Sequence, residues 1–111
     1  MTSIFKKIIN GVLPANKIFE DNDFIVIEDI NPVAPVHLLI IPKKEIKGFQ
    51  DILVEDHALM TKLVSVVQNL AIEYKISDGY RLLTNNGSQA GQTVFHLHFH
   101  LIGAAQLGSM V

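Results

Sequence analysis

The stretch TVFHLHFHLIG, residues 93–103, places three histidines, His96, His98 and His100, at every second position. Successive side chains of a β-strand point to opposite faces, so a strand over this stretch would put the three imidazoles on one side. The residues between and around them would lie on the other side and pack under a helix: Phe95, Leu97, Phe99 and Leu101. We therefore predict a half-buried strand whose histidine side faces a cleft.

Three interpretations of this histidine row are open from the residues alone. A single metal ion cannot take all three rings, because the outer two would lie about 13 Å apart at Cα, and an H-x-H pair would need further ligands. Those ligands would have to come from His37, His57 or a carboxylate. A solvated polar face is the second interpretation, since polar residues commonly alternate on a half-buried strand. Catalysis is the third, because a neutral imidazole is a nucleophile at physiological pH.

The composition of the chain predicts one domain, residues 1–111, that associates with a second copy. Hydrophobic residues make up 49% of the chain and charged residues only 18%, against about 25% in an ordinary soluble domain. A small domain with so few charges is expected to cover apolar surface in a partner, and a symmetric homodimer is the commonest form. The formal charge of −2 provides no basic surface for nucleic acid or anionic lipid.

Two further absences limit the function. The chain has no cysteine, which excludes disulfides, thiolate catalysis and cysteine-based zinc sites. It also contains neither an apolar run of membrane-spanning length nor the apolar segment of a signal peptide after Lys6 and Lys7. We therefore expect a cytoplasmic protein without a membrane partner.

The N-terminal third predicts one short helix and three strands. Residues 3–11 form a short amphipathic pattern that ends at Asn10-Gly11 and would turn four residues inward: Ile4, Phe5, Ile8 and Ile9. Residues 17–29 read as two strands joined by the turn residues 21–23. After NPVAP, residues 36–42 (VHLLIIP) form a run apolar enough for a strand that is covered on both faces.

The rest of the chain predicts one long helix and two more strands. Residues 53–74 carry an apolar stripe at helical spacing: Met60, Leu63, Val64, Val67, Leu70, Ala71 and Tyr74. Residues 79–84 and 94–102 read as strands joined through a tight turn at Asn86-Gly87. The expected fold is α+β, with an antiparallel sheet of about five strands under one long helix. Lys43 and Lys44 are expected to be solvated, and His57 to face solvent or cap the helix.

The segment from His96 to Ile102 resembles the His-φ-His-φ-His-φ-φ signature of the histidine-triad (HIT) superfamily, where φ is an apolar residue. The chain is similar to the Hint branch, the histidine-triad nucleotide-binding proteins, almost end to end, through SIFKKIING, LPANKIFED, DINPVAPVHLLIIPKK and GYRLLTNNGSQAGQTVFHLHFHLIG. No glutamine occupies or directly follows the third triad position, which argues against the transferase and dinucleoside-polyphosphate hydrolase branches. The resemblance implies a HIT-like fold whose sheet extends across a homodimer.

The resemblance also implies a reaction, which is hydrolysis of purine nucleoside phosphoramidates, or of acyl phosphates such as aminoacyl adenylates, without cofactor or metal. His98 matches the nucleophile that forms a nucleotidyl-histidine intermediate. Phosphoryl oxygens would be stabilised by His100, by Asn85, by the region of Gly91 and Gln92, and by backbone N–H groups of the loop GSQAGQT, residues 87–93. Thr93 matches a hydroxyl position near the scissile bond, and His37 and His96 match supporting positions. The alternative is a nucleotide-binding regulatory module with incidental hydrolysis.

The resemblance places a nucleoside pocket at the N-terminal end. Asp29 matches the carboxylate that binds the ribose hydroxyls, and the purine would lie between apolar residues: Ile4, Phe5, Ile8, Ile27 and Ile30. From the residues alone, the apolar set is ordinary core and Asp29 is a turn residue. The chain departs from the family at Glu45, where a histidine is common, and in its tail GAAQLGSMV, where Hint proteins often have Gly-Gly-Arg and a Trp-Pro-Pro-Gly ending. We therefore expect weak discrimination between leaving groups.

Overall fold

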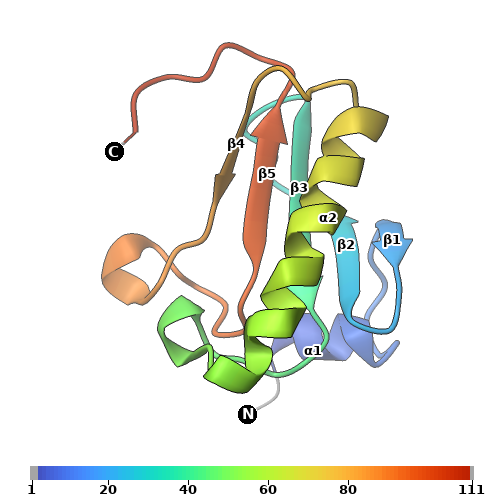
Figure 1. Cartoon of the computed structure of the whole chain (residues 1–111), viewed down its shortest axis with the longest axis vertical. Coiled ribbons are helices and arrows are strands. Elements are labelled where there is room, and N and C mark those ends of the chain that lie inside the picture. Colours follow the sequence, from blue (N-terminus) through green and yellow to red (C-terminus); the bar gives the residue numbers. More distant parts are fainter. Residues whose placement is uncertain (1–2, 111) are drawn as a thin grey trace.

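The computed structural model describes residues 3–110, which form one antiparallel five-stranded sheet with helices on both faces (Figure 1). The strand order is β1-β2-β3-β5-β4. The elements along the chain are α1 (Ile4–Ile9), β1 (Lys17–Glu20), β2 (Phe24–Glu28), β3 (Val36–Pro42), α2 (His57–Glu73), β4 (Tyr80–Leu83) and β5 (Phe99–Gly103). Short 3-10 helices cover Phe49–Asp51, Val54–Asp56 and Ser88–Ala90. The predicted α+β architecture is confirmed.

The two faces of the sheet bury two separate apolar clusters. Along β2, Phe24 and Val26 join the cluster under α2, whereas Ile25 and Ile27 join the cluster under α1, as the two-residue period of a strand requires. Every residue of β3 is buried, which confirms that this strand is covered on both faces. The central strands therefore form a fixed base between the long helix and the N-terminal helix.

The structure confirms most of what the sequence predicts for the N-terminal helix. The Ser3 side chain accepts a hydrogen bond from the N–H of Lys6, which caps the first turn, and Phe5 and Ile8 are buried. Gly11 follows the helix at φ +76°. The inward orientation predicted for Ile4 is wrong, because its side chain is 48% exposed at the rim of a cavity.

The last strand is shorter than predicted. Regular pairing of β5 begins at Phe99, so His96 and His98 precede the strand, and residues 94–96 form a bend. Leu97 donates its N–H to the carbonyl of Ile46, and the Thr84 hydroxyl donates to the carbonyl of His98 at 2.7 Å. These bonds replace ladder bonds in the stretch. The bend also leaves Phe95 46% exposed, whereas the expected packing under the helix is found for Leu97, Phe99 and Leu101.

The connection between β4 and β5 is a long loop rather than a tight hairpin. It runs from residue 84 to residue 98, and the predicted turn at Asn86-Gly87 is followed by a 3-10 helix. Gly87 has φ +88° and Gly91 has φ +94°, both in a region where glycine carries no Cβ penalty. The two glycines let the loop fold back toward the sheet.

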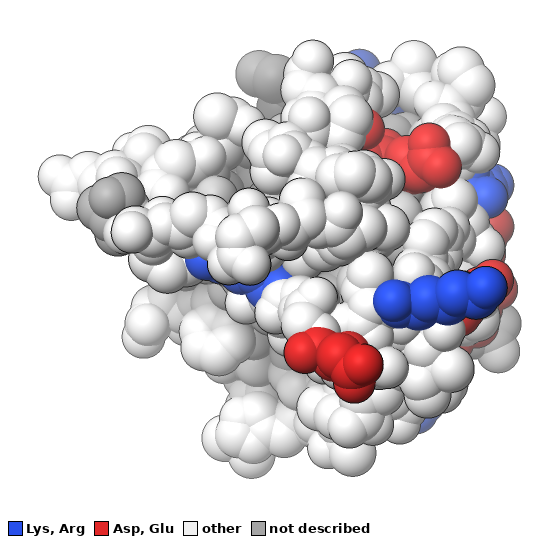
Figure 2. Space-filling model, turned by 90° about the horizontal axis from the view of Figure 1, so that it is seen from above, with Lys and Arg blue, Asp and Glu red and all other residues white. Residues whose placement is uncertain are grey.

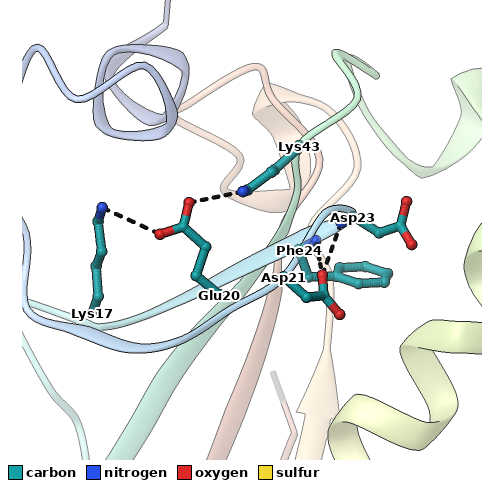
Figure 3. Close-up of polar contacts among 6 residues, drawn as sticks. All are labelled: Lys17, Glu20, Asp21, Asp23, Phe24 and Lys43. Atoms are coloured by element: carbon teal, nitrogen blue, oxygen red, sulfur yellow. Dashed lines mark hydrogen bonds and ion pairs between the residues drawn. The ribbon is translucent and has the colours of Figure 1, made fainter.

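Ion pairs hold the lysines that the sequence predicted to be solvated. Lys43 lies 2.7 Å from Glu20, which also contacts Lys17, beside the β1–β2 turn (Figure 3). Lys44 binds the buried carboxylate of Asp56, which also accepts the N–H of Leu53. The hydrogen bond from Lys44 holds the pKa of Asp56 below its ordinary value. Lys44 is exposed, as expected, whereas Lys43 is partly covered, and the sequence did not predict the ion pairs of either lysine.

The long helix begins at His57, after the 3-10 helix that ends at Asp56, and its buried residues are Leu63, Val67, Leu70 and Ala71. Val64, which the sequence placed on the buried stripe, is 54% exposed. His57 is exposed, as expected. Among residues 3–110, no helix has both the length and the apolarity to cross a membrane.

The chain leaves β5 through a strained residue. Ala104 has φ +65°, in the left-handed region that costs an L-residue about 1–2 kcal/mol, and glycine relieves this at an entropic cost of about 0.5–1 kcal/mol. We expect Ala104→Gly to raise the free energy of unfolding by about 0.5–1 kcal/mol, measured by urea denaturation. Ala105 does not have a positive φ, so Ala105→Gly should instead lower stability. A loss of stability in Ala104→Gly would contradict the assigned strain.

Candidate functional site

A cavity of about 300 Å³ brings together most of the residues that the sequence selected. It lies between α1, the end of β2 and the loop before β5. Its wall contains Ile4, Phe5, Ile8, Ile27, Glu28, Asp29, Ile30, Leu39, Asn85, Gly91, Thr93, Val94, His98 and His100. A neighbouring cavity of about 590 Å³ shares its apolar end and continues toward residues 13–16. Of the predicted site residues, only His37, His96 and Gln92 lie behind this wall, and all three are buried.

The His98 imidazole has a defined tautomer. Its Nδ1 lies 2.7 Å from the carbonyl oxygen of His96, and since a carbonyl only accepts, Nδ1 carries the proton. The Nε2 atom therefore keeps its lone pair. The His98 and Phe5 rings pack in a T-shaped arrangement at a centroid distance of 4.8 Å. Burial lowers the pKa of His98, which favours the neutral ring.

A chain of hydrogen bonds fixes the tautomer of His100 as well. The backbone N–H of Val33 donates to Nδ1 of His37 at 3.1 Å, so the proton of a neutral His37 is on Nε2. That Nε2 lies 2.9 Å from Nδ1 of His100, which must accept. The remaining nitrogen of His100, Nε2, is then an N–H donor. Burial, together with the neighbouring rings of His98 and His37, lowers the pKa of His100 to about 4.

His96, the first histidine of the triad, lies behind the cavity wall instead of facing the cleft. His96 has no exposed surface, and its Nε2 donates to the carbonyl of Pro42 at 2.7 Å. Its Nδ1 is buried with no hydrogen-bond partner in the structure. The expectation of three histidines on one open face is wrong for His96, because the bend before β5 breaks the alternation of a regular strand.

Asp29, His37 and His100 form a compact cluster at the polar end of the cavity. One ligand atom from each lies within 4.8 Å of the others, and Nε2 of His37 is 3.3 Å from the Asp29 carboxylate. A metal ligand must be an unprotonated nitrogen, whereas the Val33 N–H leaves the His37 proton on Nε2. This arrangement therefore suits hydrogen bonding. The other carboxylate oxygen of Asp29 accepts the N–H of Asn31 at 2.8 Å.

The loop before β5 uses several of its own N–H groups internally. The sequence predicted that the backbone of residues 87–93 would stabilise phosphoryl oxygens. The structure instead pairs the N–H groups of Ala90 and Gln92 with the carbonyl of Gly87, and that of Gly91 with Ser88. The side chains that line the cavity beside this loop are Asn85 and Thr93. The N–H groups of Ala90, Gly91 and Gln92 are therefore already paired within the loop.

The Gln92 side chain makes hydrogen bonds to the protein backbone that the sequence pattern did not reveal. Its amide nitrogen donates to the carbonyls of Lys47 at 2.9 Å and Val94 at 3.1 Å, and its Oε1 accepts the N–H of Gly87 at 2.8 Å. The contact with Lys47 spans 45 positions of the chain. Local sequence patterns contain no signal for such a pairing.

The tautomers give a direct spectroscopic prediction. At about pH 6, near the ordinary histidine pKa of 6.5, ¹⁵N spectra should show neutral His98 protonated at Nδ1 and neutral His100 protonated at Nε2. Because its pKa is lowered to about 4, His100 should gain charge only in more acidic solution. His37→Ala should let His100 adopt either tautomer, because it removes the donor to Nδ1. His57→Ala, at an exposed position, should leave the His100 tautomer unchanged. An Nδ1 proton on His100 of the unmodified protein would contradict the chain of hydrogen bonds from Val33 through His37 to His100.

Comparison with known proteins places this cavity in a family context. The HIT domain family model matches residues 10–107. A HIT-like protein of Chlamydia pneumoniae is 52% identical over 108 residues, covering 97% of this chain and 98% of the relative. The crystal structure of a HIT family hydrolase from Legionella pneumophila superimposes with a TM-score of 0.93 at 41% identity, covering 96% of each chain.

A histidine triad nucleotide-binding protein from Candida albicans has a TM-score of 0.82 at 31% identity, covering 99% of this chain and 86% of its own. The family match spans the histidine segment, the loop before β5 and the central strands. These relatives and the match show that the chain belongs to the HIT family.

Proposed function

We propose that this protein hydrolyses purine nucleoside phosphoramidates, with aminoacyl adenylates as related substrates, through a nucleotidyl-His98 intermediate. The observation that carries the proposal is the tautomer of His98, whose unprotonated Nε2 belongs to a ring in the cavity wall. The similarity to a HIT family hydrolase and to a nucleotide-binding HIT protein supports a hydrolase that acts on nucleotides. The choice of the phosphoramidate bond rests on the sequence resemblance to the Hint branch.

The first chemical step is attack by the lone pair of His98 Nε2 on the α-phosphorus. The P–N bond to the amine breaks, and its electron pair leaves with the amine nitrogen, which takes a proton relayed from water by the hydroxyl of Thr93. The proton stays on Nδ1 of His98, hydrogen-bonded to the carbonyl of His96, and this bond stabilises the positive charge that the ring acquires. Negative charge on the phosphoryl oxygens is met by Nε2–H of His100 and the amide of Asn85.

The second step returns the enzyme to its starting state. The hydroxide left by the water that protonated the amine attacks the same phosphorus, the bond from phosphorus to His98 breaks, and the electron pair returns to Nε2. Overall, the oxygen and one hydrogen of the water remain on the nucleoside monophosphate, and the other hydrogen is on the released amine. His98 ends with the same tautomer, because its partner is a backbone carbonyl that does not titrate.

The nucleoside half is assigned to the apolar end of the cavity. Ile4 and Ile8 of the helix and Ile27 of β2 line both neighbouring cavities, and such side chains bury the faces of a flat base. Asp29 lies between this end and His100, where its carboxylate is suited to accept from ribose hydroxyls. Ile30 is 91% exposed, so a bound base would cover apolar surface that solvent now contacts.

The decisive variant is His98→Ala. Loss of the nucleophile should lower turnover of a fluorogenic adenosine phosphoramidate by several orders of magnitude while AMP binding persists, because the substitution removes the covalent step. Thr93→Ala should lower the rate only moderately. Turnover should also persist in mildly acidic buffer, because the lowered pKa values of His98 and His100 keep both rings neutral there. Near-normal turnover in His98→Ala would disprove the mechanism.

We further propose a homodimer built on α2 and the sheet edge at β4. Exposed apolar side chains lie on both elements, including Val64 and Ile72 on the helix and Leu82 on the strand. β4 is the last strand of the sheet on that side and has an unpaired edge suited to a second copy. The face seen in Figure 2 carries few charges separated by broad uncharged areas, as a low charge fraction implies.

The assembly is tested by sedimentation at micromolar concentration. The unmodified chain should sediment with twice its 12.3 kDa mass, and Leu82→Lys should sediment as a single chain. Phe19→Lys is the matched control, because Phe19 is 39% exposed and Leu82 42% exposed, but Phe19 is on the opposite edge strand, β1. A single-chain mass for the unmodified protein would refute the dimer.

A further inference from the structure

We propose that Gln92 is a positioning residue that fixes the cavity loop, defined as residues 85–94, and thereby sets the geometry of phosphate binding. The proposal rests on the proposed function, because it concerns the same cavity. It differs from the role implied by family resemblance, in which this region supplies donors to the substrate. The side-chain amide of Gln92 is instead committed to the protein backbone.

The Gln92 side chain links three points of the backbone through its amide, and we call this set of hydrogen bonds the brace. Its side chain is only 5% exposed, and both ends of its amide are used. The bond to the Lys47 carbonyl joins the cavity loop to the segment after β3, while the bonds to Gly87 and Val94 join the two ends of the loop. Removing the amide would leave the backbone groups that it pairs on these three residues without that partner, in part-buried surroundings where an unmade hydrogen bond is costly.

The brace acts on residues that line the cavity. Gly91 and Thr93, the immediate neighbours of Gln92, are both in the cavity wall, whereas Gln92 is not. The backbone N–H of Gln92 also bonds to the carbonyl of Gly87, whose own N–H bonds to the Gln92 side chain. Both backbone groups of Gly87 are thus held by one residue. A shift of Gln92 would therefore move the Thr93 hydroxyl.

Gly48 lies so close to the side chains of Asn86 and Gln92 that a Cβ atom on it would be crowded. A Cβ on Gly48 would lie 2.9 Å from Oδ1 of Asn86 and 3.3 Å from Oε1 of Gln92. Gly48 has φ −163°, an extended conformation open to any residue, so space is what requires glycine here. The same Asn86 oxygen accepts the N–H of Gln50 at 2.9 Å. The cavity loop and residues 47–50 are therefore in close contact.

This close contact provides two independent ways to disturb the brace. Gln92→Met keeps the approximate length of the side chain and removes its hydrogen bonds. Gly48→Ala leaves the Gln92 side chain chemically intact and pushes against Asn86 and Gln92. Gln89→Met is the matched control, because Gln89 is an exposed glutamine of the same loop. None of these three positions contributes a side chain to the cavity wall.

The experiment compares the affinities of AMP and adenosine, by calorimetry, in the unmodified protein and the three variants. The two ligands differ only in the phosphate, so their affinity ratio reports phosphate positioning and is unaffected by a reduced fraction of folded protein. We expect Gln92→Met and Gly48→Ala to reduce the ratio by about tenfold or more, since small displacements in a binding site have large effects. Gln89→Met should leave the ratio unchanged.

Two further readouts complete the test. Amide hydrogen exchange at Gly87, Gly91 and Gln92 should accelerate in the two brace variants and not in the control. The single-turnover rate of His98 nucleotidylation, per folded site, should fall about tenfold or more in the same two variants. If Gln92→Met fails to fold, Gly48→Ala carries the comparison.

The failures of the two proposals are distinguishable. An unmodified protein that binds neither AMP nor adenosine would reject the proposed function, and the positioning role with it. Binding by the unmodified protein with an unchanged affinity ratio in Gly48→Ala and in any folded Gln92→Met would reject the positioning role alone. Faster exchange without a change in the ratio would mean that Gln92 only stabilises the loop.

Discussion

The hydrogen bond from Nδ1 of His98 to the carbonyl of His96 is the interaction on which the site depends. It forms because residues 94–96 bend and the ladder of β5 starts only at Phe99. In a regular strand that carbonyl would point along the sheet and pair with a neighbour. The irregular stretch leaves it free for the imidazole, which acquires a single tautomer without any acidic side chain.

Burial rather than charge sets the chemistry of the cavity. Two packed apolar clusters hold the sheet between α1 and α2, and the histidines lie at the edge of this dry interior. Burial is the largest cause of the lowered pKa of His96, His98 and His100. The rings are therefore neutral donors and acceptors, each with a defined direction. Such preorganised dipoles need no reorganisation when charge develops on a bound group.

The sequence predicted features whose signals are local. The uninterrupted apolar run of β3 showed that both its faces are covered, and the spacing of the long helix located its buried residues, although it also included the exposed Val64. It misplaced His96, because the bend that buries this ring depends on the Ile46 carbonyl, 51 residues before Leu97. The ion pair between Lys44 and Asp56 and the contact between Gln92 and Lys47 were missed for the same reason. Such pairings arise from packing, which single-residue patterns do not encode.

The donor-to-acceptor direction of the hydrogen bonds that run through His37 to His100, here called the relay, is set by the main chain. Its first donor is the peptide N–H of Val33, a group that does not lose its proton at any pH a protein experiences. The side chain of Val33 is 71% exposed and contributes nothing to this role. Nearly any amino acid at this position would preserve the direction of the relay, and proline, which lacks the N–H, would remove it. Position 33 therefore tolerates many side chains but requires a backbone N–H.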